Sequence, residues 1–153
     1  MGYTTEFTGT FKLNKKLDAE THKLLVGLSE TRRVARNIEG YGVQGEFYVD
    51  GSGFAGQNRE ANIIDYNRPP KTQPGLWCNW TPTEDGMEIE WNGAEKFYYY
   101  VEWIEYLLNK VLLPRGYSLH GAVAWSGEEE GDLGAIQISK GVVRTLKGEV
   151  TYK

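Results

Sequence analysis

The sequence predicts an α+β fold in which two helices pack on one face of a mostly antiparallel sheet. Apolar residues alternate with polar ones over several short segments, and they recur at helical spacing over two longer segments. Few of the connections are long enough to join parallel strands. With 153 residues, 40% of them hydrophobic and 25% charged, we expect residues 1–153 to form one domain with its own core.

The N-terminal part of the chain is expected to hold one strand and one helix. Residues 6–13, "EFTGTFKL", alternate in the manner of a half-buried strand. Asp18 is placed to cap a helix over residues 19–37, with Leu24 and Leu28 on its apolar stripe. The end of this helix would carry Arg32, Arg33 and Arg36. These cations either complement the helix dipole or bind an anion.

Residues 38–75 contain seven glycines and three prolines, which predict a long ordered loop with a short strand at 46–50. Within it, "GSGFAG" at 51–56 has the spacing of a dinucleotide-binding turn. Residues 57–66 are too few for the helix and parallel strand that such a fold requires. The segment is therefore either a loop that holds a phosphate with Arg59 or Arg68, or a surface turn.

The second half predicts a hairpin, a helix and a meander. Residues 76–82 and 87–91 form the hairpin around Asp85 and Gly86. Asn92 would cap a helix over 94–112, which Pro114 ends. The last strands, "YSLHGAVAWSG", "LGAIQISKG" and "VVRTLKGEV", would turn at 128–132 and 139–141.

The hairpin pattern separates tryptophans that look alike in sequence. Cys78, Trp80, Ile89 and Trp91 are expected on the core face, whereas Trp77 shares the other face with Asn79 and Glu90. His120 is expected on the small-residue face of the next strand. An aromatic ring beside amide and carboxylate groups suits a planar ligand. The alternative is a second small core, in which Phe54 and Ile64 cover Trp77.

Composition argues against several classes of function. A net charge of −4 makes nucleic-acid binding unlikely, and one cysteine with two histidines predicts no metal site and no cofactor. No apolar run is long enough for a membrane span, so we expect a cytoplasmic protein. Tyr98, Tyr99 and Tyr106 are expected on the exposed face of the predicted helix 94–112, and exposed tyrosines favour a homo-oligomer. Catalytic patterns are weak: Glu88 with Glu90, or His120 as a base, would be needed for an enzyme.

Several longer runs resemble a family of small uncharacterised bacteriophage and prophage proteins: "TRRVAR", "GFAGQ", "DYNRPP", "QPGLWCNW", "IEWNGAEKFYYYVEWIEYL" and "GYSLHGAVAWSGE". The resemblance covers nearly the whole chain and brings no site residues with it. It implies a phage accessory protein acting in the infected host cell. By analogy, such a protein is similar in role to the sponges that sequester nucleotide immune signals of ADP-ribose or cyclic-nucleotide type.

We therefore expect a non-enzymatic protein that binds and sequesters a nucleotide-derived small molecule. In that interpretation Trp77 stacks on a base, Asn79 and Glu90 bind its edge or a ribose, and His120 and Phe54 complete the site. Arg32, Arg36 or Arg68 would hold phosphate. Two alternatives remain, which are an adaptor or inhibitor that binds a host protein, and a hydrolase of a nucleotide signal.

Overall fold

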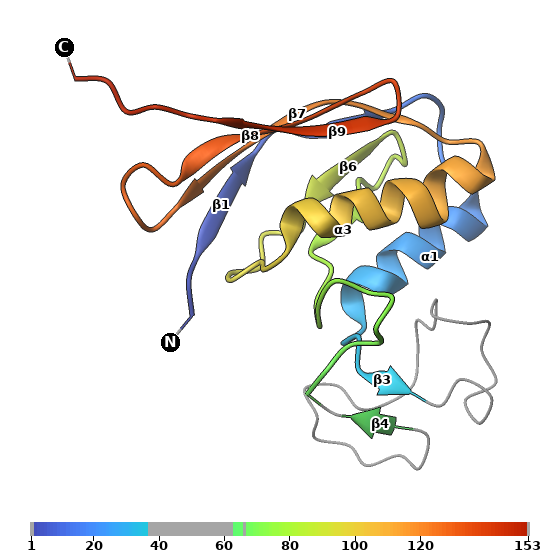
Figure 1. The fold of residues 1–153 in the computed structure, drawn as a ribbon. Coiled ribbons are helices and arrows are strands. Elements are labelled where there is room, and N and C mark those ends of the chain that lie inside the picture. The colour runs from blue at the N-terminus through green and yellow to red at the C-terminus, as the bar shows by residue number, and fades with distance from the viewer. Residues whose placement is uncertain (1, 37–62, 66, 153) are drawn as a thin grey trace.

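The computed structural model describes residues 2–36, 63–65 and 67–152. Seven strands form an antiparallel sheet in which β5, β6, β2, β7, β8 and β9 are neighbours in that order and β1 also pairs with β7. They are β1 Thr5–Thr8, β2 Phe11–Leu13, β5 Trp80–Pro82, β6 Glu88–Trp91, β7 Leu119–Gly127, β8 Leu133–Ser139 and β9 Val142–Lys147. Figure 1 shows helices α1 (Ala19–Glu30) and α3 (Tyr100–Tyr106) lying next to each other below β7, β8 and β9. The predicted α+β class is confirmed.

The expected strand over 6–13 is interrupted and forms β1 and β2. Gly9 lies between them with φ 105°, in the left-handed region where glycine is favoured. A Cβ atom at Gly9 would lie 3.0 Å from the carbonyl oxygen of Ala122 on β7. The bend lets β1 pair with β7, while β2 pairs with both β7 and β6.

Helix α1 begins as predicted and ends earlier than predicted. Asp18 caps it by accepting a hydrogen bond from the Thr21 backbone N–H at 2.7 Å, and that bond, with others from the Thr21 and Tyr117 side chains, lowers the pKa of Asp18. The prediction that the helix reaches residue 37 is wrong, because it stops at Glu30. Beyond it, the Arg33 N–H donates to the Leu76 carbonyl at 2.7 Å, so the backbone bonds to a distant segment instead of continuing the helix.

The chain then forms β3 (Ala35–Arg36), which pairs with β4 (Ile63–Asp65) in a separate two-stranded sheet. This pair lies on the side of α1 away from the main sheet (Figure 1). The three arginines are therefore not the last turns of a helix, and the dipole explanation for them does not hold. The predicted strand at 46–50 and the "GSGFAG" segment lie outside the described residues.

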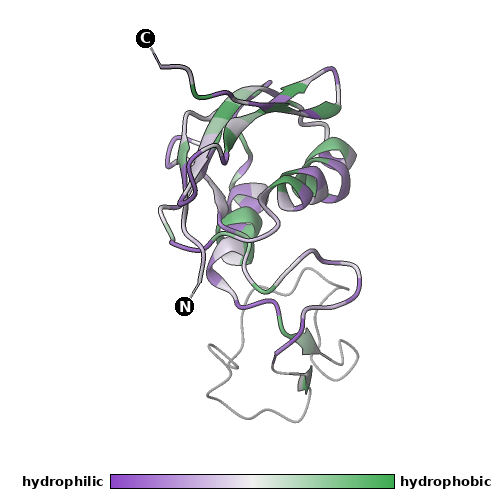
Figure 2. Ribbon diagram, turned by 60° about the vertical axis from the view of Figure 1, so that its left-hand side comes forward, coloured by the Kyte–Doolittle hydropathy of each residue, from purple (hydrophilic) through white to green (hydrophobic). Residues whose placement is uncertain are grey.

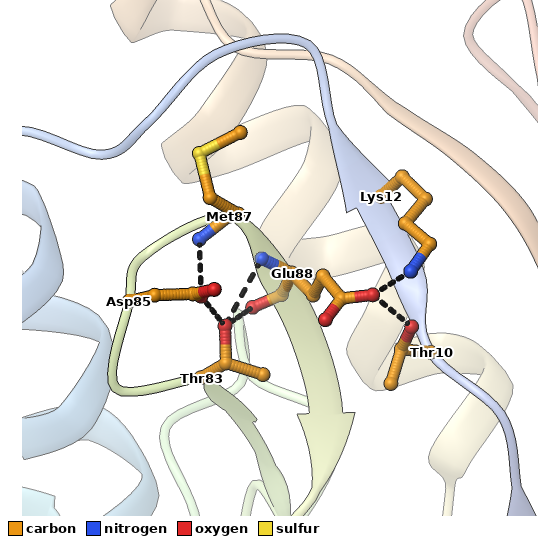
Figure 3. Close-up of polar contacts among 6 residues, drawn as sticks. All are labelled: Thr10, Lys12, Thr83, Asp85, Met87 and Glu88. Atoms are coloured by element: carbon orange, nitrogen blue, oxygen red, sulfur yellow. Dashed lines mark hydrogen bonds and ion pairs between the residues drawn. The ribbon is translucent and has the colours of Figure 1, made fainter.

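Strands β5 and β6 form the predicted hairpin, with Trp80 opposite Trp91 and Pro82 opposite Ile89. Its turn is held by side chains (Figure 3): Asp85 accepts hydrogen bonds from the Met87 N–H at 3.0 Å and from the Thr83 hydroxyl at 2.6 Å. These bonds lower the pKa of the Asp85 carboxyl. The side chains of Trp80 and Ile89 are buried, as is Cys78, and Trp91 packs against the same core, so the predicted core face is confirmed.

The second helix starts at Tyr100, and the prediction of a helix from residue 94 is wrong. Asn92 does not cap it, because its Oδ1 accepts a hydrogen bond from the Ala94 N–H at 2.9 Å within a local turn. Lys96 and Tyr99 then take left-handed conformations with φ 60°, which no helix accommodates. After α3 the chain continues as a π-helical segment, Leu107–Leu112, and a 3-10 turn, Leu113–Arg115.

One core joins the helices to the sheet. Phe7 of β1 contacts aromatic rings from the hairpin and from the second helical region, with ring centroids 5.2 Å from Trp80, 5.6 Å from Phe97 and 5.0 Å from Tyr100. Figure 2 shows hydrophobic and hydrophilic residues together on each helix, as expected of elements with one buried side. In the meander, Leu119, Val123 and Ile136 are buried as their alternation predicts, and the three predicted strands are confirmed.

Candidate functional site

The structure contains a pocket of about 810 Å³ beside the C-terminal end of α1, enclosed by segments 67–79 and 92–99. Its lining residues are Ser29, Asn67, Pro69, Pro74, Gly75, Leu76, Trp77, Asn79, Asn92, Ala94, Glu95, Lys96, Tyr98 and Tyr99. Pockets for small molecules commonly measure roughly 300 to 1,000 Å³. This pocket therefore has room for a ligand the size of a nucleotide.

Segment 67–79 is held in place by a series of hydrogen bonds between the side chains of Arg33, Gln73 and Tyr106. Arg33 is 0% exposed, and its Nε donates to the Gln73 side-chain oxygen at 3.1 Å. The Gln73 amide in turn donates to the Tyr106 hydroxyl at 3.1 Å. A guanidinium group is buried only where hydrogen bonds compensate its lost hydration, so these bonds hold the residues preceding Gly75 in one place.

Segment 92–99 is attached to segment 67–79 by a pair of asparagines. The Asn92 N–H donates to the Asn79 carbonyl at 2.9 Å, and the two side-chain amides join at 3.3 Å. Trp91 Nε1 donates to the Ala94 carbonyl at 3.0 Å. At the far end, the Tyr98 hydroxyl accepts a hydrogen bond from the Tyr3 N–H at 3.0 Å. Segment 92–99 is one wall of the pocket. It is hydrogen-bonded to Asn79 near one end and to Tyr3 near the other.

The chemistry of the lining is aromatic and amide-rich. Trp77 is partly exposed, and Tyr98 and Tyr99 are 50% and 57% exposed. Aromatic rings supply stacking faces for planar groups, while amides donate and accept hydrogen bonds. Glu95 and Lys96 add one charge of each sign at the exposed edge of the pocket. The arrangement can bind a planar polar molecule.

The sequence-predicted site residues do not all come together. Trp77 and Asn79 line the pocket, although Asn79 is buried and its side chain is bonded to Asn92. Glu90 lies on β6 opposite Thr81, and neither it nor His120 is a lining residue of the pocket. His120 is exposed on β7, opposite Lys12 of β2.

The predicted basic residues and Phe54 have separate positions. Arg68 is exposed between the lining residues Asn67 and Pro69, and Arg32 is partly buried just after α1. For Arg36 the structure describes the backbone in β3, and Phe54 lies outside the described residues.

The sequence patterns did not identify Arg33 and Asn92 as residues that hold the pocket walls in place. No spacing rule distinguishes Arg33 from its two neighbouring arginines. A turn-forming role for Asn92 was available from the Asn92-Gly93 dipeptide, which usually marks a turn.

Glu88, one of the carboxylates considered for catalysis, is engaged outside the pocket. Glu88 accepts a hydrogen bond from the Thr10 hydroxyl at 2.7 Å and forms an ion pair with Lys12 (Figure 3). Burial raises the pKa of the Cys78 thiol to about 12, so it remains protonated at neutral pH. Among the residues that the structure describes, no three His, Cys, Asp or Glu side chains lie close enough together to hold a metal ion.

The expected tyrosine surface is only partly present. Tyr98 and Tyr99 are exposed but precede α3, whereas Tyr106 is buried and hydrogen-bonded to Gln73. The prediction that Tyr106 contributes to an exposed helix face is therefore wrong, because segment 67–79 covers that side of the helix.

Comparisons with family models, curated proteins and solved structures gave no match. The geometry of the pocket is therefore the main basis for a functional proposal. Within the described parts of the chain, no helix has the length and apolar character needed to cross a membrane.

Proposed function

We propose that this protein binds a planar, nucleotide-derived small molecule in the pocket between segments 67–79 and 92–99, and sequesters it without cleaving it. The observation that carries the proposal is the lining of the 810 Å³ pocket, where Trp77, Tyr98 and Tyr99 lie beside side-chain amides. Aromatic faces stack on a base regardless of its identity, and amides bind its polar edge.

The charges near the pocket suit the remainder of a nucleotide. Lys96 lies at the exposed end of the lining, and Arg68 is exposed beside the lining residues Asn67 and Pro69. Cations at an exposed rim bind phosphate without the cost of burying it. We therefore place the base inside the pocket and the phosphate at its edge.

The resemblance to phage proteins supports a role in the infected host cell, where sequestering a nucleotide immune signal would protect the phage. Binding without cleavage is favoured because Glu88 is occupied by Lys12 and Thr10, and Glu90 and His120 do not line the pocket. A homo-oligomer is part of this proposal, since Tyr98 and Tyr99 present exposed aromatic area.

A thermal-shift panel of mononucleotides, ADP-ribose and cyclic dinucleotides tests the proposal. A ligand at 100 times its dissociation constant should stabilise the chain by about 2.7 kcal/mol. Trp77→Leu should lower the affinity about 5- to 150-fold, since stacking on an aromatic side chain contributes about 1 to 3 kcal/mol per base.

Tyr152→Leu is the matched control, because it removes an 80% exposed aromatic ring that does not line the pocket. No shift with any nucleotide would refute the proposal and favour the adaptor alternative, for which Tyr98 and Tyr99 supply the exposed contact area. Recovery of altered ligand after denaturation would favour the hydrolase alternative.

A further inference from the structure

The indole N–H of Trp103 is a buried donor for which the described part of the chain offers no acceptor. Trp103 lies on α3 and is 0% exposed, and no described residue accepts a hydrogen bond from its Nε1. By contrast, Nε1 of Trp80 donates to the Tyr100 carbonyl at 2.9 Å, and Nε1 of Trp125 donates to Asp132 at 3.1 Å. A buried indole N–H normally has such a partner, because leaving it unpaired costs free energy.

The unpaired nitrogen lies directly behind the pocket wall. A Cβ atom built on Gly75 would be 3.4 Å from Trp103 Nε1 and 3.1 Å from the Tyr99 ring. Gly75 and Tyr99 both line the pocket. The missing side chain at position 75 therefore leaves a narrow space where the pocket, the Tyr99 ring and the indole N–H converge.

Tyr99 is the group that can open this space. Its ring is 57% exposed, and its backbone takes the left-handed conformation with φ 60° and ψ 37°. A tyrosine in that region is strained relative to ordinary helix or strand geometry. It is also the N-cap residue of α3 and makes no side-chain capping bond. A change of side-chain rotamer at Tyr99 would therefore break no hydrogen bond to another residue that the structure describes.

We propose that Trp103 Nε1 is the specificity donor of the pocket and binds a carbonyl oxygen on the base of the ligand, after Tyr99 moves aside. This inference rests on the proposed function. An indole N–H donates and cannot accept, so it selects an oxygen over an amino group at the same position. The neighbours of the indole are uncharged: Gly75 lies next to its Nε1 and to the Tyr99 ring, and the Trp103 and Tyr106 ring centroids are 5.3 Å apart.

A neutral oxygen fits this position better than a phosphate does. Burying a phosphate against one neutral donor would leave most of its charge uncompensated. The phosphate therefore belongs at the rim near Lys96, and the base enters first. The ligand class is a nucleotide whose base carries an oxo group, such as hypoxanthine, guanine or uracil, in preference to adenine.

The test compares IMP and AMP by titration calorimetry in the full chain and in Trp103→Phe. The wild-type protein should prefer IMP. Trp103→Phe should weaken IMP binding about 2- to 12-fold, which is the fold-change that corresponds to the loss of one neutral hydrogen bond. AMP binding should change less, so the preference should shrink. Trp80→Phe is the matched control, because it removes an indole N–H from the same core that already has an acceptor. It should leave the IMP preference unchanged.

Two further measurements separate this donor role from a role in packing. In the spectrum of ¹⁵N-labelled indole groups, the Trp103 resonance, assigned from its loss in Trp103→Phe, should move downfield when IMP binds. Gly75→Ala should abolish binding while the chain stays folded, since Gly75 does not have positive φ and its new Cβ would fill the space beside Nε1.

The outcomes distinguish this inference from the proposed function. If the wild-type chain binds nucleotides but Trp103→Phe keeps the same IMP and AMP affinities, or the indole resonance does not move, the donor role is overturned and the pocket proposal stands. If the wild-type chain binds no nucleotide, the proposed function itself fails.

Discussion

Gln73 connects the stability of the chain to the shape of the pocket, and Gln73→Met tests that connection. Methionine keeps the length and volume of the side chain but removes the acceptor for Arg33 Nε and the donor for the Tyr106 hydroxyl, both bonded at 3.1 Å. A hydrogen bond to a charged group contributes about 1.5 to 3 kcal/mol, and a neutral one about 0.5 to 1.5 kcal/mol. We therefore expect the free energy of unfolding to fall by about 2 to 4.5 kcal/mol.

Urea denaturation followed by tryptophan fluorescence measures this loss. Domains of this size have a total stability of about 5 to 15 kcal/mol, so the variant should fold, with a melting temperature lower by about 4 to 18 °C. The effect should extend to function, because Pro74, Gly75 and Trp77 of the pocket wall follow Gln73 directly. Affinity for any ligand of the pocket should fall as well.

Two variants control for other causes. Gln137→Met makes the same chemical change at an exposed position of β8 and should alter stability by less than about 0.5 kcal/mol. Tyr106→Phe removes the hydroxyl that accepts the hydrogen bond from Gln73. The loss of stability in the double variant with Gln73→Met should differ from the sum of the two single losses by about 0.5 to 1.5 kcal/mol. If Gln73→Met lowers the free energy of unfolding by less than about 1 kcal/mol, or if the losses of the two single variants are fully additive, the bonds between Arg33, Gln73 and Tyr106 do not support segment 67–79 as argued.

Two other predictions concern the core and the strand bend. The pKa of Cys78 is raised from 9.0 to about 12 by burial, so the neutral thiol stabilises the fold fully below pH 9, and this contribution should decline between pH 9 and 12 as the unfolded thiol ionises. Denaturation of the wild-type chain and Cys78→Ala at pH 8 and 10.5 should show a smaller pH dependence in the variant; equal dependence contradicts the assignment. Gly9→Ala should cost about 1 to 3 kcal/mol, because alanine is strained at φ 105° and its Cβ would lie 3.0 Å from the Ala122 oxygen. Gly93→Ala, at φ 85° with no atom within 4 Å of the new Cβ, should cost less in the same melting experiment, and an equal cost would exclude the close approach at Gly9 as a cause.

Period-two alternation predicted most of the sheet because most of its strands bury alternate side chains, although β9 is largely exposed. The meander of β7, β8 and β9 and the hairpin of β5 and β6 follow their patterns, including the burial of Trp80 and Ile89. In such segments one rule, the alternation of side chains, decides both the secondary structure and its orientation. The bend at Gly9 departed from the pattern because it depends on the close approach of Ala122, a residue distant in sequence.

Helix ends were predicted less well, since bonds between distant segments override local preference. Thr31, Arg32 and Arg33 have no helix-breaking side chain, yet Arg33 N–H bonds to Leu76 and the helix stops at Glu30. At the other helix, Asn92 satisfied the capping pattern but bonds to Ala94 in a turn. A capping pattern and a turn pattern share the same residue types, so spacing does not separate them.

The same physical cause explains why the candidate site was only half predicted. Alternation placed Trp77 opposite the core, which agrees with its position in the lining, but it also grouped Glu90 and His120 with Trp77 as though one flat face carried all three. The pocket lies instead where alternation ends, between an irregular segment and a turn with left-handed residues at 93, 96 and 99. An irregular backbone must find its hydrogen bonds outside a strand ladder. Here the Arg33 N–H donates to the Leu76 carbonyl, the Asn92 N–H to the Asn79 carbonyl and the Ala94 N–H to the Asn92 side chain. Side-chain bonds add to these: Arg33 bonds to Gln73, Gln73 to Tyr106, and Asn92 to Asn79. The two walls are therefore positioned by contacts between segments distant in sequence, which the alternation of side chains along one strand does not encode.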